Sequence, residues 1–409
     1  MQRRSILLLP AAFAALLAAA PARADLITDW NVAANELMNL ENVGNNPRSR
    51  SLAMMHVAMA DAINTVQNRY TRVVATMPLN PDATAEAAAN AAARTILLQL
   101  YPKQKDKIEA AYAAGLKGLA EGSALRAGIA LGEQVAAAVQ ADRANDGTSA
   151  PDTYRPHAAP GAYVTTAPAA FPQYATAKPW LLARADVFRP APPPPLSSAT
   201  WARDYNEVKE LGGAKSSARS ADQSDAVTFW RNANFGPSWQ AAARQLATAR
   251  ELSLVECARL FALMNMGFAN NYIVNWDAKY TFNFWRPVTA IRNGDLDGND
   301  ATERDAGWTP SNPTPLHPEY PSQATINATV GAAILEAVFG PVSAIPITVT
   351  DIADAKRTRS FNSIADMVEE QKNVRIWGGV HFRSAILTGR EMGLKVSAHL
   401  LENALKPVR

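Results

Sequence analysis

The chain has 409 residues, of which 48% are hydrophobic and 19% are charged, and its formal net charge is +3. This length suffices for one large domain or two medium ones, each with its own core. The small net charge excludes a strongly basic surface, so we expect neither nucleic acid nor an anionic membrane as a partner.

Residues 1–24 have the pattern of a secretory signal peptide. Arg3-Arg4 precedes an apolar run over residues 6–20, and the stretch closes with Ala22-Arg23-Ala24. We therefore expect an exported protein, periplasmic or secreted, with the paired arginines leaving both the Sec and the twin-arginine routes open. Without this leader, 37 basic residues face 37 acidic ones. No later segment has an uninterrupted apolar run of membrane-spanning length.

The region of residues 25–150 is predicted to form an N-terminal helical bundle. Four of its stretches are rich in Ala and Leu, with apolar residues at intervals of three and four, and helix breakers separate them. These stretches are residues 49–66, 83–101, 103–120 and 123–144.

Residues 151–197 differ from their surroundings in being rich in proline. Eleven of the chain's 27 prolines fall in this segment, and no helix can run through them because proline removes the amide donor and clashes with the preceding turn. A disordered linker is one interpretation. The density of aromatic residues favours an ordered strap packed over the helices; they are Tyr154, Tyr163, Phe171, Tyr174, Trp180 and Phe188.

Helical patterns resume in residues 198–409, and no run of alternating residues predicts a strand convincingly. The lone Cys257 lies in an apolar helical pattern, so we expect a buried structural thiol. The simplest architecture is all-α, with two packed helical bundles, residues 25–150 and 198–409, joined by the strap.

Two cations in the sequence DAKYTFNFWRPVTAIR are candidates for an anion site. Lys279 and Arg286 are seven residues apart, which on one helix is two turns and places both heads on the same face. They could be two solvated surface cations. The aromatic residues between them instead favour an anion held between the two charges.

A second pair follows in the sequence NVRIWGGVHFRSA. Gly378-Gly379 should end the element that carries Arg375 and turn the chain, so that His381 approaches the same point. An imidazole at such an electropositive centre can act as a nucleophile or a metal ligand. Ser322, at the start of another helical pattern, could donate to an oxyanion or simply cap the helix.

Together these residues resemble the signature shared by vanadium-dependent haloperoxidases and the type 2 phosphatidic acid phosphatase superfamily. The order is Lys-x6-Arg-Pro, Pro-Ser and Arg-x5-His. It is carried here by Lys279, Arg286-Pro287, Pro321-Ser322, Arg375 and His381, and the resemblance extends over most of the chain.

The resemblance implies a fold of two four-helix bundles and a bound vanadate, for which phosphate competes. Lys279, Arg286 and Arg375 would neutralise the anion. Ser322 and the backbone N–H of Gln323 would donate to it. His381 would be the axial vanadium ligand, and the enzyme would use hydrogen peroxide to oxidise a halide to hypohalous acid, which reaches a small organic acceptor.

The sequence departs from the family at the acid/base position. The family usually has Pro-Ser-Gly-His, whereas this chain has Gln323 and Ala324 after Ser322. The carboxylate that the family sometimes has four residues after the last His is here Ala385, so the partner of His381 is not identified. His317 is the candidate substitute for the missing acid/base His. If it handles the proton of incoming peroxide, the rate of halide oxidation should depend on one ionisation near pH 6.5. The alternative is that His317 only braces a turn.

Two other functions stay open on the sequence alone. One is a soluble phosphatase with His381 as nucleophile, and the other is a non-catalytic oxyanion-binding protein. A homo-oligomer is compatible with either. Calcium is not expected, because the loop that begins Asn293-x-Asp295-x-Asp297-Gly298 has Arg304 at its twelfth position. The remaining histidines are interpreted as structural or surface residues, namely His56, His157 and His399.

Overall fold

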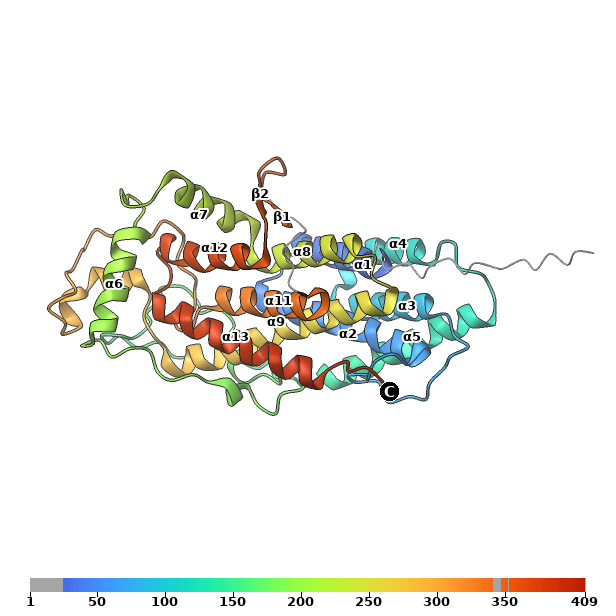
Figure 1. Ribbon diagram of the computed structural model, residues 1–409. Coiled ribbons are helices and arrows are strands. Elements are labelled where there is room, and N and C mark those ends of the chain that lie inside the picture. The colour runs from blue at the N-terminus through green and yellow to red at the C-terminus, as the bar shows by residue number, and fades with distance from the viewer. Residues whose placement is uncertain (1–24, 341–346, 352, 409) are drawn as a thin grey trace, which may run out of the picture.

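The computed structural model describes residues 25–340, 347–351 and 353–408, so the predicted signal peptide lies outside the described residues. Its regular secondary structure is helical apart from one small hairpin (Figure 1), which confirms the all-α prediction. The helices of the first third gather at one end of an elongated molecule. They are α1 (Asp25–Leu40), α2 (Asn45–Gln67), α3 (Ala85–Leu100), α4 (Lys105–Leu116) and α5 (Ser123–Arg143).

Among the described residues from 199 onwards there are eight further α-helices and one hairpin. The hairpin pairs β1 (Ile347–Thr350) antiparallel with β2 (Thr358–Phe361), a small exception to the expectation of no strands. Strands of four residues are too short to show a clear alternation of apolar and polar residues in the sequence. The helices are α6 (Ala199–Gly212), α7 (Ala221–Ala233), α8 (Phe235–Ala249), α9 (Leu254–Phe282), α10 (Pro287–Arg292), α11 (Gln323–Phe339), α12 (Ile364–Trp377) and α13 (Arg383–Asn403).

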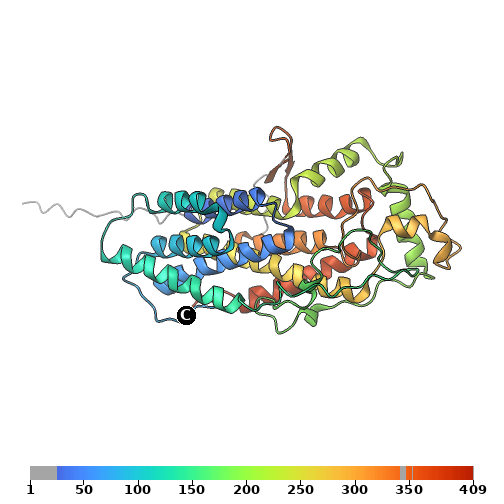
Figure 2. The ribbon, with the colours of Figure 1, turned by 180° about the vertical axis from the view of Figure 1, so that it is seen from behind.

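Helix α9 is the central spine of the molecule. It is buried from Leu254 to Lys279 with few interruptions, and it packs against α2 and also against α11 and α13 (Figure 2). Most of its buried residues are apolar, as is typical of a helix in the core of a large domain. One continuous hydrophobic core runs from the N-terminal helices to the C-terminal ones, whereas the division into units at residues 150 and 197 stays a prediction.

The Pro-rich segment is an ordered strap that packs on α9. Both Trp276 Nε1 and Tyr280 Oη donate hydrogen bonds to the carbonyl of Ala170, each at 2.9 Å. Tyr174 is buried against Tyr272 and Trp276. These contacts confirm the ordered interpretation, and they cover the end of α9 that carries Lys279.

The remaining expectations concern single residues. Cys257 and His56 are buried, as expected of structural residues, and His157 is exposed. In the calcium-like loop, Asp297 accepts hydrogen bonds from Trp201 and Thr302. Over the described part of the chain, no helix combines the length and apolar character needed to cross a membrane.

Candidate oxyanion-binding site

Lys279 and Arg286 do not lie on one helix, which corrects the sequence prediction. Helix α9 ends at Phe282, Asn283 follows in the left-handed conformation with φ 47°, and Arg286 precedes the first turn of α10. The residue before a proline is disfavoured in the helical region, so Arg286-Pro287 explains the break. The two side chains nevertheless converge on the loop of residues 317–321.

Lys279 uses its ammonium group to hold this loop. The side chain is fully buried, and Nζ donates to the carbonyls of Pro318, Glu319 and Pro321 at 2.8, 2.8 and 2.6 Å. Burial and the neighbouring Arg286 lower the pKa of Lys279 well below its usual value. Three acceptors require three N–H donors, so we assign the ammonium form, in which no donor is left for a ligand.

Arg286 joins the two halves of the site. Its Nε donates to the carbonyl of His317 at 2.9 Å, and its Nη1 donates to the carbonyl of Val380 at 2.7 Å. The same Nη1 lies 3.3 Å from His381 Nε2, and Nη2 lies 2.9 Å from His317 Nδ1. Because a guanidinium can only donate, we assign both of these ring nitrogens as acceptors. His317 Nδ1 also lies 3.2 Å from the carbonyl of Pro318, a longer contact that is not a hydrogen bond under this assignment. Burial lowers the pKa of Arg286 to about 10.

Glu319 is the partner of His381, and sequence reasoning missed it. Its Oε1 lies 2.7 Å from His381 Nδ1 and accepts the backbone N–H of Phe382 at 2.9 Å. His381 therefore carries its proton on Nδ1 and presents an unprotonated Nε2. Burial and three nearby cations lower the pKa of His381 well below its usual value, whereas burial raises the pKa of Glu319 to about 7.

The turn at Gly378-Gly379 brings His381 back to Arg375, as predicted. Helix α12 ends at Trp377, Gly379 has a φ of 73°, and the carbonyl of Arg375 accepts the N–H groups of Val380 and His381 at 3.1 and 3.3 Å. A left-handed φ of this kind favours glycine. Arg375 itself is half-buried, and burial lowers its pKa to about 9.

The start of α11 supplies Ser322 and Gln323. Ser322 is the N-cap residue without a capping hydrogen bond from its side chain, and its backbone N–H already donates to the carbonyl of Ala385 at 3.0 Å. Gln323 is the first helical residue, and its Nε2 is buried without a partner. The positive end of the helix dipole at this point favours an anion.

A cavity of about 400 Å³ opens beside these groups, a volume typical of small-molecule sites. Aromatic and carboxamide side chains form much of its wall, including Phe235, Tyr272, Asn312 and Asn327. Of the predicted site residues, His317, Gln323, Arg375 and His381 line it, whereas Lys279, Arg286 and Ser322 lie behind its wall.

His317 packs against Trp276, with ring centroids 4.9 Å apart, and accepts a hydrogen bond from Arg286. Desolvation and the adjacent cations lower the pKa of His317 well below its usual value. The expected ionisation of this residue near pH 6.5 is therefore wrong. Glu319 is the group in the site that titrates near neutrality.

Comparison with known proteins finds similarity to one group of enzymes. Residues 259–409 match the family model of the VCPO second helical-bundle domain. The chain is 33% identical over 91 residues to the vanadium chloroperoxidase of Curvularia inaequalis, an alignment that spans 22% of this chain and only 15% of that relative.

Two solved structures share the fold over most of the chain. The first bacterial vanadium-dependent iodoperoxidase is 21% identical, with a TM-score of 0.79 over 94% of this chain and 98% of its own. A holo-type bacterial vanadium-dependent chloroperoxidase is 19% identical, with a TM-score of 0.69 over 87% of this chain and 91% of its own. At these identities the likeness shows the fold.

Proposed function

We propose that the chain is a vanadium-dependent haloperoxidase, on the basis of the match of residues 259–409 to the VCPO second helical-bundle domain. In this proposal it binds vanadate in the cavity beside His381 and oxidises a halide with hydrogen peroxide. The observation that carries this proposal is the pairing of an unprotonated His381 Nε2 with donors that lack partners on Arg375 and Gln323. Hypohalous acid would then reach a small organic acceptor, for which the cavity has room.

The residues present fit a tetrahedral oxyanion. A buried N–H without an acceptor costs roughly 1–3 kcal/mol, and Arg375 Nε and Gln323 Nε2 are two such groups at one cavity. An anion would satisfy both and would reduce the repulsion between the clustered cations. Lys279 and Arg286, whose donors are mostly used within the protein, would contribute positive potential from behind the wall. Phosphate is also a tetrahedral oxyanion and should compete.

His381 would be the protein ligand of the vanadium. Vanadate, when bound, supplies an electrophilic centre that activates peroxide towards attack by a halide. The chain's own task is to keep His381 Nε2 free of a proton. Glu319 does this by accepting a hydrogen bond from Nδ1–H at 2.7 Å, which leaves the ring's lone pair on Nε2. Arg286 Nη1, which lies 3.3 Å from Nε2, would have to give up that contact for Nε2 to hold the vanadium.

Proton transfer must differ from that of the usual Pro-Ser-Gly-His site. Gln323 can donate a hydrogen bond but cannot exchange a proton, and Ala324 can do neither. Apart from His381, His317 is the imidazole that lines the cavity in the described part of the chain. Because its Nδ1 accepts from Arg286, the neutral ring carries its proton on Nε2. We assign His317 the orientation of bound peroxide through this Nε2–H, not the uptake of the peroxide proton.

A phosphatase is the second candidate. An imidazole whose Nδ1 proton is held by a carboxylate is also the arrangement of a nucleophile. An alkoxide leaving group, however, needs a proton donor that contributes roughly 10²–10⁴-fold in rate. We therefore expect poor hydrolysis of alkyl phosphates.

One preparation can test both candidates. Protein freed of bound anions is assayed for hydrolysis of alkyl and aryl phosphates and then, after addition of orthovanadate, for peroxide-dependent halide oxidation. The proposal expects the second activity to exceed the first. Efficient alkyl phosphate hydrolysis without halide oxidation would favour the phosphatase, and vanadate binding without either activity would favour an oxyanion-binding protein.

Export is also part of the proposal. Residues 1–24 would direct the chain to the periplasm or the medium. N-terminal sequencing of protein recovered from those fractions tests this. A mature chain that keeps residues 1–24 would contradict it.

A further inference from the structure

Arg375 is held differently from the other two cations of the site. Lys279 and Arg286 donate hydrogen bonds to backbone carbonyls. Within the described ranges, the Arg375 side chain has no hydrogen-bond acceptor, and its Nε is buried without a partner. Its guanidinium carbon lies 5.4 Å from the centroid of the Phe235 ring, a cation–π contact.

Phe235 is in turn fixed by Trp230. The two rings are nearly parallel, at 4°, with centroids 5.4 Å apart. Trp230 is near the end of α7 and only 2% exposed, whereas Phe235 begins α8. Trp230 Nε1 donates to Glu370 Oε1 at 2.7 Å. The Arg375 guanidinium, the Phe235 ring and the Trp230 indole therefore form a continuous stack. The hydrogen bond to Glu370 connects the indole to α12, the helix that also carries Arg375.

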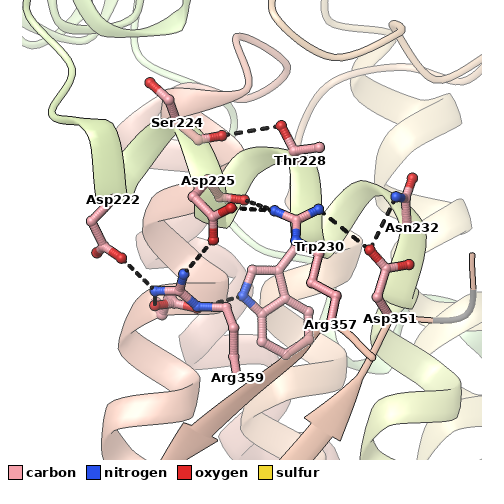
Figure 3. A network of polar contacts seen from close by, with 10 residues as sticks. Asp222, Ser224, Asp225, Thr228, Trp230, Asn232, Asp351, Arg357 and Arg359 are labelled. Atoms are coloured by element: carbon pink, nitrogen blue, oxygen red, sulfur yellow. Dashed lines mark hydrogen bonds and ion pairs between the residues drawn. The ribbon is translucent and has the colours of Figure 1, made fainter. Parts of the chain in front are cut away.

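Glu370 belongs to an ion-pair network through Arg359. Figure 3 shows Arg359 together with its partners Asp222 and Asp225. The other oxygen of Glu370 accepts from Arg359 of β2 at 2.7 Å, and Arg359 also pairs with Asp222 and Asp225 of α7 at 3.1 and 3.0 Å. The network thus joins α7, the hairpin and α12. Single exposed ion pairs contribute little, but several that share partners restrict geometry.

We propose that Phe235 and Trp230 are positioning residues that hold the Arg375 guanidinium ready for the oxyanion, with Glu370 fixing the indole. The inference rests on the proposed function, since it concerns the anion of that site. Without the ring, the unbonded guanidinium would sample several rotamers, and ordering it would oppose anion binding. Positioning of this kind affects affinity for the anion more than stability.

The test measures the dissociation constant for orthovanadate by calorimetry, with thermal unfolding followed in parallel. Phe235→Leu removes the aromatic face, and Glu370→Leu removes the acceptor of Trp230. Each should weaken binding about 3- to 10-fold, as expected for the ordering of one long side chain. Glu370→Gln keeps an acceptor oxygen for the indole and should restore most of the affinity.

Glu369→Leu is the matched control. Glu369 is the neighbour of Glu370 on α12 and pairs with Lys372 at 2.6 Å on the exposed face, away from the aromatic stack. The Glu369→Leu variant should bind orthovanadate with the same affinity as the wild type. If Phe235→Leu is too unstable to measure, the test is the comparison of orthovanadate affinity between Glu370→Leu and Glu370→Gln.

The outcomes separate this inference from the proposed function. Weakened binding in Phe235→Leu and Glu370→Leu but not in the control supports the positioning role, even if no halide is oxidised. Equal affinity in all variants overturns it and leaves vanadate binding standing. A wild-type protein that binds neither vanadate nor phosphate overturns both.

Discussion

Replacement of Glu319 by Gln should strengthen anion binding while it weakens catalysis. Glu319 is fully buried, and its Oε1 accepts from His381 Nδ1 at 2.7 Å and from the Phe382 N–H at 2.9 Å. The amide oxygen of Gln can accept both bonds, so the geometry survives and the negative charge is lost. His381 then becomes a poorer ligand, because a carboxylate behind the ring raises the basicity of Nε2.

The magnitude follows from the separation of the charges. The hydrogen bond of 2.7 Å, an imidazole roughly 2 Å across and a contact of about 3 Å place an anion about 8 Å from Glu319. At an effective dielectric constant of about 20, the repulsion is about 2 kcal/mol per unit charge, or roughly 30-fold in affinity. Turnover in halide oxidation should fall about 10- to 100-fold, the usual effect of losing such a partner.

The pH dependence identifies the group. The pKa of Glu319 is raised to about 7, so the wild-type carboxylate is charged at pH 8 and mostly protonated at pH 5.5. Sulfate is the probe, because it does not titrate in this range. At pH 8 about one wild-type molecule in ten is protonated at Glu319 and binds sulfate as the variant does, so Glu319→Gln should bind sulfate about 10-fold more tightly than the wild type. At pH 5.5 the two should agree within about 3-fold.

The variant should fold. A raised carboxyl pKa means that the folded state holds the proton more tightly, so charged Glu319 costs stability as the pH rises from 4.5 to 7, by roughly 3 kcal/mol. Gln removes this cost but leaves an amide N–H without an acceptor, since Oε2 has no partner, which costs about 1–3 kcal/mol. An affinity difference that persists unchanged at pH 5.5, or an inflection near pH 7 that survives in Glu319→Gln and vanishes in His317→Ala, would refute this reasoning.

Three further predictions concern two cations of the site and one buried imidazole. Arg375→Ala should weaken orthovanadate binding roughly 10- to 150-fold, since a charge-assisted hydrogen bond contributes about 1.5–3 kcal/mol; unchanged affinity by calorimetry would remove Arg375 from the site. Lys279→Met should speed hydrogen exchange of the backbone amides in the 317–321 loop, including that of Glu319, about 10-fold or more, because three carbonyls of the loop lose their donor. If mass spectrometry finds exchange at the wild-type rate, Lys279 does not hold this loop in place. The pKa of His56 is lowered to about 3 by burial, so the folded state prefers the neutral ring and this residue costs stability as the pH falls below 6.5. His56→Gln should therefore reduce the loss in unfolding free energy between pH 6 and 4 by about 1.4 kcal/mol per pH unit, and an unaltered slope in chemical denaturation would show that His56 does not set it.

Local patterns in the sequence were sufficient for the fold class and for part of the site. The Ala- and Leu-rich periodicity predicts the helices, and the aromatic residues among the prolines predict an ordered strap. Gly378-Gly379 predicts the turn that returns His381 to Arg375, because a positive φ at Gly379 is a local requirement.

The rest depends on contacts between distant parts of the chain. Glu319 and His381 are 62 residues apart, and no periodicity connects them. The use of all three Lys279 donors on the carbonyls of the 317–321 loop is likewise invisible in the sequence, because backbone acceptors carry no residue signature. The separation of Lys279 and Arg286 onto two elements could have been found, since Pro287 disfavours a helical Arg286.

Titration of anion-free protein with orthovanadate, followed by peroxide-dependent halide oxidation at each addition, tests the central claim most directly. We expect the halide-oxidising activity to rise from zero and to saturate at one vanadate per chain. Phosphate should reduce this activity by competing with vanadate, and His381→Ala should show none. Activity that increases in proportion to vanadate without saturation, and equally in His381→Ala, would mean that the oxidation occurs in solution and that this site does not perform it.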